Sequence, residues 1–295
     1  MSDALAPDLL ARIGDLELVA RIVVEGLVSG LHRSPFHGYS AEFSQYRHYR
    51  PGDDLKYVDW KLVARTDRVY TKQFRETTNM ASTLVVDTSA SMNFPGAPLS
   101  KFRYAVIAAA ALGHVVSSQG DAIGLMTSQD EYAVYLAPRA GRQHLRALLG
   151  ALSALEPRGG WRAAETIRRA AERLQRRGLL LVFSDFYDDE EQVWAQLRRA
   201  GRMGHEVVLF QIMSREEIDL PYRQDLEFTD LETGQRLAID PGLARRDYRD
   251  AVAAFLERTR MHAGAEGFQY SLIVTDTAPD YALRNFLLAR GGART

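Results

Sequence analysis

The chain has 295 residues, of which 46% are hydrophobic and 25% are charged, the composition of an ordinary globular protein able to bury a large core. Its 37 basic and 38 acidic residues leave a formal net charge of −1, so no overall field attracts it to nucleic acid or to an anionic membrane. The absence of cysteine excludes disulfides, thiol catalysis and zinc–thiolate sites, and it suits a reducing cytoplasm.

The N-terminal segment predicts an amphipathic helix rather than a signal peptide or a membrane span. Asp3 and Asp8 lie where a signal peptide would carry basic residues and then an apolar core, so we expect a cytoplasmic protein. Residues 9–28 contain five charged residues, whereas a spanning helix needs about 20 predominantly apolar ones. Apolar residues recur there at helical spacing, which indicates a helix packed on the body of the protein or on a partner.

Residues 30–80 are rich in aromatic and charged side chains, and we interpret them as a small strand-rich extension. Pro51 and Gly52 favour a turn there, because proline fixes φ and glycine tolerates a positive φ. The alternating segment 68–76 predicts a strand. We therefore divide the chain into an N-terminal helix and strand-rich extension, residues 1–80, and a larger domain, residues 81–295.

From residue 82 onward, apolar strands alternate with helices, which predicts an α/β fold with a doubly wound, mostly parallel sheet. Two strands, 122–127 and 132–136, are close enough in sequence to form a hairpin, and a second small hairpin is expected at 226–239. The other expected strands are 82–86, 179–183, 206–212 and 270–274. The expected helices are 101–118, 143–152, 162–176, 190–203, 244–262 and 281–288.

Two of the predicted strands end at an acidic residue. Asp87 follows the strand 82–86, with Ser89 and Ser91 at the next alternate positions, and Asp185 follows the strand 179–183. Ligands gather at the carboxyl ends of strands in open α/β sheets, and Mg²⁺ prefers carboxylate and hydroxyl oxygens. These four residues therefore predict a site for Mg²⁺ or Mn²⁺. The alternative is structural: turn residues that bond the local backbone, with Asp185 capping a helix.

Asp87, Ser89 and Ser91, with Asp185 on a later strand, resemble the metal-ion-dependent adhesion site of von Willebrand factor A domains. Such sites usually take a threonine from a Gly-Gly-Thr loop, where this chain has Gly159, Gly160 and Trp161. Thr166 falls inside a predicted helix and is a poor substitute. The resemblance therefore implies direct coordination by Asp87, Ser89 and Ser91, with Asp185 acting through water, in a weak or vestigial site.

Upstream of that site, the chain resembles the signature of a bacterial family with a domain of unknown function 58. The matching segments are Glu42-Phe43, residues 49–54, residues 58–60 and residues 64–66. The likeness runs from about Gly30 through the closing helix. It implies a von Willebrand factor A-like fold and association with MoxR-type AAA+ ATPases.

Residues of this signature are candidates for a partner-binding surface, together with Trp161, whose indole would anchor a partner if exposed. The alternative for the charged residues is an ion-paired joint between the extension and the larger domain. For Trp161 the alternative is core packing. The candidates are Arg50, Pro51, Gly52, Asp53, Asp54, Asp59, Trp60, Arg65 and Trp161.

The sequence contains no Walker phosphate loop, dinucleotide-binding glycine motif or nucleophile elbow. We therefore expect a non-catalytic protein-interaction module, and the family resemblance implies that it is an adaptor or partner of a MoxR-type ATPase. A bound metal would offer a vacant coordination position to an acidic residue of the partner. Two alternatives stay open: a metal-dependent phosphoesterase that uses Asp87 and Asp185, and a metal-free module whose surface is formed by Trp161 and residues 50–60.

Overall fold

The computed structural model consists of two compact units, Phe36–Met80 and a larger unit that combines Met1–Pro35 with Ala81–Thr295. The predicted boundary near residue 80 coincides with one junction, but the N-terminal helical segment, predicted to group with the extension, belongs to the larger unit. The residues that the structure describes are 6–28, 41–50, 58–66, 68–76, 80–94, 98–129, 132–187, 190–224, 226–229, 231 and 234–292.

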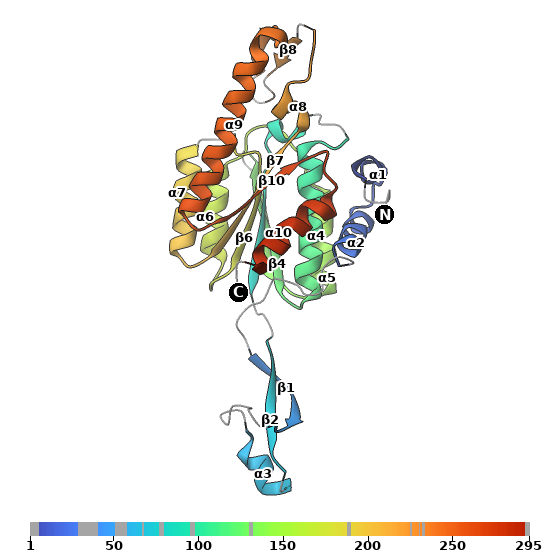
Figure 1. Cartoon of the computed structure of the whole chain (residues 1–295), viewed down its shortest axis with the longest axis vertical. Helices are drawn as coiled ribbons and strands as arrows, with labels where there is room; N and C mark the ends of the chain where they lie inside the picture. Colours follow the sequence, from blue (N-terminus) through green and yellow to red (C-terminus); the bar gives the residue numbers. More distant parts are fainter. Residues whose placement is uncertain are drawn as a thin grey trace. The chain divides into compact units, whose positions relative to one another are not determined.

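The larger unit is built on a six-stranded sheet in the order β10-β7-β6-β3-β4-β5 (Figure 1). All neighbouring strands are parallel except β4 and β5, which form the expected hairpin. β3 and β6 lie centrally and are buried on both faces, which explains their continuous apolar sequences. The predicted mostly parallel sheet is confirmed. The strands are β3 (Ala81–Val86), β4 (Ala122–Gln129), β5 (Tyr132–Arg139), β6 (Leu179–Ser184), β7 (Glu206–Met213) and β10 (Gln269–Val274).

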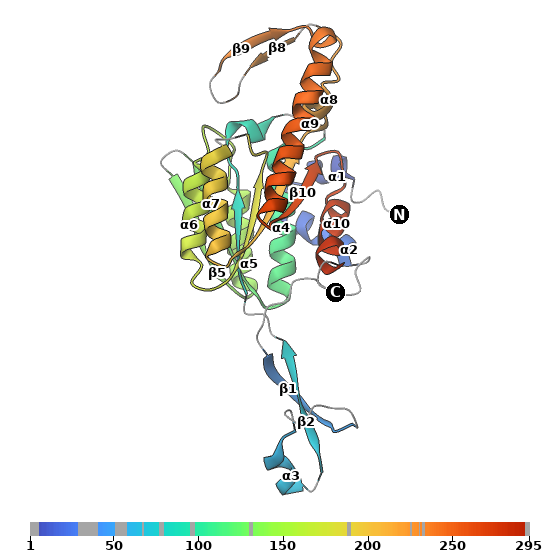
Figure 2. The ribbon, with the colours of Figure 1, turned by 60° about the vertical axis from the view of Figure 1, so that its left-hand side comes forward.

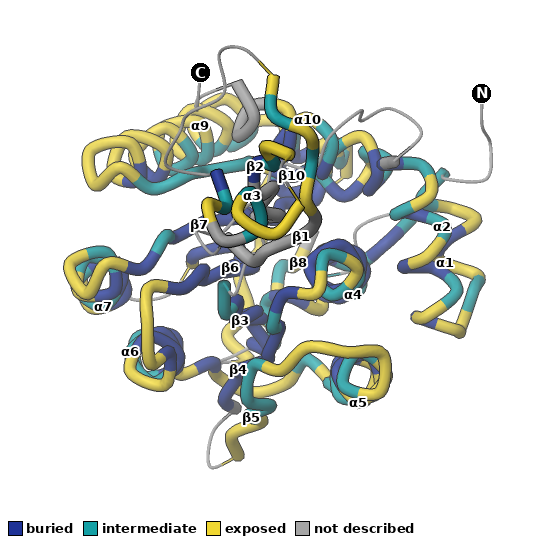
Figure 3. The backbone as a smooth tube through the Cα atoms, turned by 90° about the horizontal axis from the view of Figure 1, so that it is seen from below, coloured by how far each residue is buried: buried dark blue, intermediate teal, exposed yellow. Residues whose placement is uncertain are grey.

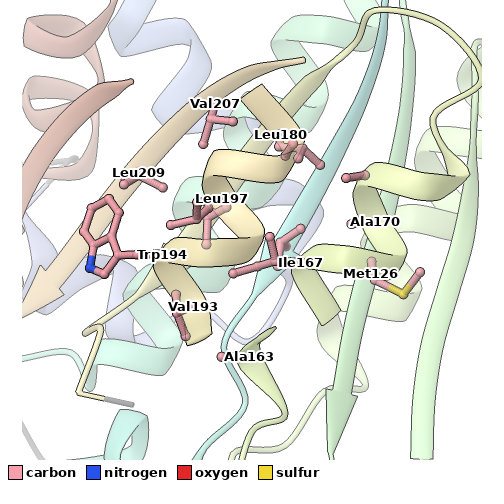
Figure 4. Close-up of a cluster of buried hydrophobic side chains, with 14 of the residues drawn as sticks. Met126, Ala163, Ile167, Ala170, Leu180, Val193, Trp194, Leu197, Val207 and Leu209 are labelled. Atoms are coloured by element: carbon pink, nitrogen blue, oxygen red, sulfur yellow. The ribbon is translucent and has the colours of Figure 1, made fainter. Parts of the chain in front are cut away.

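Helices cover both faces of this sheet (Figure 3). α6 (Ala163–Arg173), α7 (Glu190–Arg202) and α9 (Pro241–Ala265) lie on one face. α4 (Lys101–Ser118), α5 (Arg142–Ser153) and α10 (Pro279–Gly292) lie on the other. Between α6, α7 and the sheet, apolar side chains such as Ile167, Leu197 and Leu180 form a buried cluster (Figure 4). This packing gives the expected doubly wound architecture.

The N-terminal segment forms two helices, α1 (Pro7–Arg12) and α2 (Leu16–Val28), where a single helix was expected. The break has a local cause, because the Asp15 carboxylate accepts hydrogen bonds from the backbone N–H groups of Glu17 and Leu18 and so starts a new helix. α2 packs on α4 and α10, which confirms the expected packing on the body of the protein. Among the described residues, no helix is long and apolar enough to cross a membrane.

The smaller unit contains an antiparallel pair, β1 (Ala41–His48) and β2 (Tyr70–Glu76), which agrees with the predicted strand-rich extension. A short helix, α3 (Trp60–Thr66), was not predicted. Asp59 explains why it starts there: its Oδ1 accepts a hydrogen bond from the Leu62 N–H (3.1 Å) and its Oδ2 accepts one from the Tyr46 hydroxyl (2.8 Å). Asp59 therefore caps α3 and ties it to β1.

The predicted second hairpin is formed by β8 (Leu226–Thr229) and β9 (Arg236–Ile239), which pair antiparallel. It follows α8 (Arg215–Asp219) and leads into α9, and it lies at the end of the larger unit where the parallel strands terminate (Figure 2). α9 begins three residues before its expected start at residue 244, because Asp240 caps it and Pro241 occupies its first turn.

Candidate functional site

The carboxyl ends of β3 and β6 bring the predicted metal ligands together. The two strands are adjacent and parallel, and the Asp87 N–H donates to the Phe183 carbonyl (2.9 Å), which continues the ladder one residue past the strand. Asp87 and Asp185 therefore emerge at the same edge of the sheet, and both are buried. The turn after β3 continues into a short 3₁₀ helix, η3 (Ala90–Asn93), which carries Ser91. We call Asp87, Ser89, Ser91 and Asp185 the crest.

The four crest residues form one hydrogen-bonded chain. Asp87 Oδ1 accepts from the Ser89 N–H (2.8 Å) and the Ser89 hydroxyl (2.6 Å), and its Oδ2 accepts from the Ser184 hydroxyl (2.5 Å). The Ser89 and Ser91 hydroxyls lie 2.9 Å apart, and the Ser91 hydroxyl donates to Asp185 Oδ2 (3.1 Å). Their polar atoms are thus linked to one another, as expected of buried polar groups.

A lysine completes this chain. Lys101, the first residue of α4, is 0% exposed, and its Nζ lies 2.7 Å from Asp185 Oδ2 and 2.6 Å from Glu217 Oε1. Glu217 is fixed by a capping box at the start of α8, in which it and Ser214 each bond the other's backbone N–H. The ammonium group therefore bridges the end of β6 and α8.

Lys101 and Glu217 are not marked as site residues by the sequence. The Ser-x-x-Glu pattern at residues 214–217 predicts a helix start, but nothing local connects it with the crest. A lysine at the start of a helix is ordinarily solvated, and only the tertiary fold shows that this one is buried.

Burial and neighbouring charges shift the pKa values of Asp87 and Lys101. It raises the pKa of Asp87 to about 8, with a further contribution from the negative charge of Asp185, while hydrogen bonds from Ser184 and Ser89 act in the opposite direction. Burial by itself lowers the pKa of Lys101. The carboxylates of Asp185 and Glu217 outweigh that effect and raise this pKa above its usual value, so Lys101 is charged at neutral pH.

The crest has the oxygen groups that a divalent metal prefers, but these groups already bond other parts of the protein. Hydroxyl and carboxylate oxygens converge there, as a hard cation requires. However, Asp185 is already paired with a buried ammonium, and Thr166, the poor substitute for the missing threonine, donates to the Arg162 carbonyl and bonds Ser128 instead. Within the described ranges, no group of three or more acidic or histidine residues is arranged to hold a metal. The residues present do not fit a resident metal ion.

An open groove of about 770 Å³ is lined by crest residues, the β8–β9 hairpin and α9. Its polar lining includes Ser89, Ser91 and Asp185 of the crest and Glu216 and Glu217 of α8. Several of its apolar side chains remain exposed, Leu237 at 62%. The apolar and aromatic lining consists of Phe94, Tyr187, Leu220, Tyr222, Phe228, Leu231, Leu237, Ile239, Tyr248 and Val252.

Trp161 does not form the predicted surface anchor. It is only 5% exposed and belongs to the apolar cluster with Phe186 and Trp194, so its role is packing. In the smaller unit, Trp60 is 62% exposed. Arg50 and Arg65 are also exposed. These three stay candidates for partner contact, whereas Asp59 has the capping role described above. The signature residues Pro51, Gly52, Asp53 and Asp54 lie outside the described residues.

Comparisons with known proteins identify the family. A family model described as protein of unknown function DUF58 matches residues 45–260. An uncharacterized protein of Mycobacterium tuberculosis is 32% identical over 255 residues, which cover 84% of this chain and 79% of that protein. An uncharacterized protein of Mycobacterium bovis matches to the same extent.

A solved structure with low sequence identity shares the fold. A crystallised aerotolerance-related membrane protein from Bacteroides fragilis has a TM-score of 0.50 at 14% identity, over 72% of this chain and 99% of that one. The von Willebrand factor A domain of SpRpn10 has a TM-score of 0.42 at 15% identity, over 70% and 94% of the two chains. With its six-stranded, mostly parallel sheet, the larger unit has a von Willebrand factor A-like fold, and the chain belongs to the DUF58 family.

Proposed function

We propose that this protein is a non-catalytic protein-interaction module that acts with a MoxR-type AAA+ ATPase and takes an apolar segment of that partner into the groove. The observation that carries the proposal is the exposure of apolar side chains along an open groove beside the crest. Exposed apolar surface that is contiguous and rimmed by polar residues is characteristic of interaction sites. The choice of ATPase comes from the family resemblance.

The groove suits a polypeptide segment. Its floor and walls come from η3, α8, the β8–β9 hairpin and α9, so a bound segment would contact several elements at once. Aromatic rings such as those of Tyr222 and Phe228, 6.1 Å apart in an edge-to-face arrangement, offer flat apolar contacts with little loss of side-chain entropy.

No contact among the described residues supports the alternative that the protein is a metal-dependent phosphoesterase. It requires Asp87 and Asp185 to hold a metal ion whose bound water attacks the substrate. In the structure Asp185 bonds Ser91 and Lys101, and Asp87 bonds Ser89 and Ser184. Both carboxylates serve the internal network, which favours a structural role for them.

The test is calorimetric titration of the purified chain with a purified MoxR-type ATPase from the same organism. Leu237→Glu places a charge in the groove and is expected to weaken binding at least about tenfold, or about 1.4 kcal/mol. Leu243→Glu is the matched control, because Leu243 is 82% exposed on α9 and does not line the groove. Equal affinities for the two variants, or no binding by the wild type, would refute the proposal.

A further inference from the structure

The sequence predicts only oxygen ligands at the crest, but the structure places the buried ammonium of Lys101 beside Asp185. We propose that Lys101 takes the place of a divalent metal at the crest, so that the wild-type chain orders this site without metal and gains a metal site only when the charge of Lys101 is removed. This inference goes beyond the proposed function, because it concerns what holds the crest together rather than what binds beside it.

The first argument is charge compensation. Asp185 and Glu217 are both buried, and a buried carboxylate without a partner is strongly disfavoured. Lys101 is fully buried between them, with Nζ at 2.7 Å from one carboxylate and 2.6 Å from the other. A divalent ion bound to crest carboxylates would perform this same neutralisation. The lysine supplies the positive charge from within the chain.

The second argument is competition for one oxygen. Asp185 Oδ2 accepts from the Ser91 hydroxyl and from the Lys101 ammonium at once. A metal ion that bound Ser91 and Asp185 would sit close to the ammonium and be repelled by it, or would have to displace it. The start of α4 fixes the lysine backbone, since Ser100 caps the helix with a bond from the Arg103 N–H. Displacement would therefore leave a charged side chain without its buried partners.

The third argument is that the crest is already ordered. The bonds from Asp87 through Ser89 and Ser91 to Asp185 join two strand ends and η3, and Lys101 extends them to Glu217 on α8. These are the connections that a bound ion would otherwise make between the loops. Removing the lysine charge leaves the oxygen ligands in place with an excess of negative charge, which is the environment that Mn²⁺ or Mg²⁺ prefers.

The experiment titrates Mn²⁺ into chelator-treated full-length protein, with heat measured by calorimetry and free Mn²⁺ by electron paramagnetic resonance. Lys101→Met is expected to bind one Mn²⁺ per chain at least tenfold more tightly than the wild type. Lys101→Arg keeps the charge and is expected to bind no more tightly than the wild type. Equal affinity of the wild type and Lys101→Met, whether both bind or neither binds, would overturn the proposal.

Two further variants keep the test decisive if Lys101→Met folds poorly. Lys101→Met/Glu217→Gln removes one of the stranded carboxylates and keeps all four crest residues, and Mn²⁺ is expected to raise its unfolding temperature but not that of the wild type. Adding Asp87→Asn to this pair is expected to abolish the rise. No rise in the double variant, or a rise that survives Asp87→Asn, would show that the lysine does not stand in for a crest metal.

Discussion

The crest and the groove share one end of the sheet, but they are built in opposite ways. At the crest, Asp87 and Asp185 are buried, each accepts a hydrogen bond from a crest serine, and Asp185 is also paired with the buried Lys101. In the groove, apolar side chains such as Leu237 remain exposed to solvent and unpacked. The polar groups of the residues that form the recognisable motif are therefore bonded within the protein and order the site. The surface suited to a partner comes from the hairpin and helix beside them, which carry no motif.

The largest effect expected to test this contrast is the loss of the crest cation. Lys101→Met leaves Asp185 and Glu217 without a buried positive partner, so we expect the free energy of unfolding to fall by about 3–5 kcal/mol. Urea denaturation followed by circular dichroism measures it. A loss below about 1 kcal/mol would mean that water reaches the crest and that its ion pairs resemble surface pairs.

A double-mutant cycle sharpens the same point. Glu217→Gln alone and together with Lys101→Met gives the coupling between the two side chains, expected at about 0.5–3 kcal/mol because they are in direct contact. Additive effects would show that the 2.6 Å contact contributes no coupling to stability.

A further prediction compares Trp161 and Trp60, both of which the sequence marks as candidates for a partner-binding surface. Trp161→Ala is expected to cost about 3 kcal/mol, at the lower end of the range for core tryptophans, because a small cavity of about 10 Å³ already lies beside the ring. Trp60→Ala, at an exposed position of α3, is expected to stay within about 0.5 kcal/mol. Thermal unfolding of both variants measures the difference. An unchanged stability for Trp161→Ala would restore its assignment as a surface anchor.

The fold was predictable because its signals are local. Continuous apolar runs ending at Asp87 and Asp185 mark buried parallel strands, and their adjacency follows from alternating strands and helices. The crest could be identified for the same reason, since Ser89 and Ser91 lie within four residues of Asp87. What escaped prediction depends on capping: α3 begins just after Asp59 and α2 begins just after Asp15, because each carboxylate accepts a hydrogen bond from a backbone N–H in the first turn of its helix.

The rest of the site could not be predicted because its contacts are distant in sequence. Lys101 meets Asp185 across 84 residues and Glu217 across 116. In the sequence it only opens an alanine-rich helix, where lysine is normally solvated. Likewise the hairpin at residues 226–239 was expected, but no pattern in it indicates that it lines a groove together with the crest and α9.

The smallest expected effect concerns the wall of the groove. Asp240 caps α9 by accepting a hydrogen bond from the Gly242 N–H (2.7 Å), so Asp240→Ala is expected to cost about 1 kcal/mol. The loss stays small because the next turns are held independently: Arg245 donates to the Leu220 carbonyl (3.0 Å) and the Tyr248 hydroxyl donates to the Glu217 carbonyl (2.7 Å). Hydrogen exchange should therefore accelerate only in the first turn of α9, and affinity for the proposed ATPase partner should fall less than in Leu237→Glu. Faster exchange extending past Tyr248 would instead mean that the groove wall depends on its cap, and that the groove is less preformed than its contacts with α8 indicate.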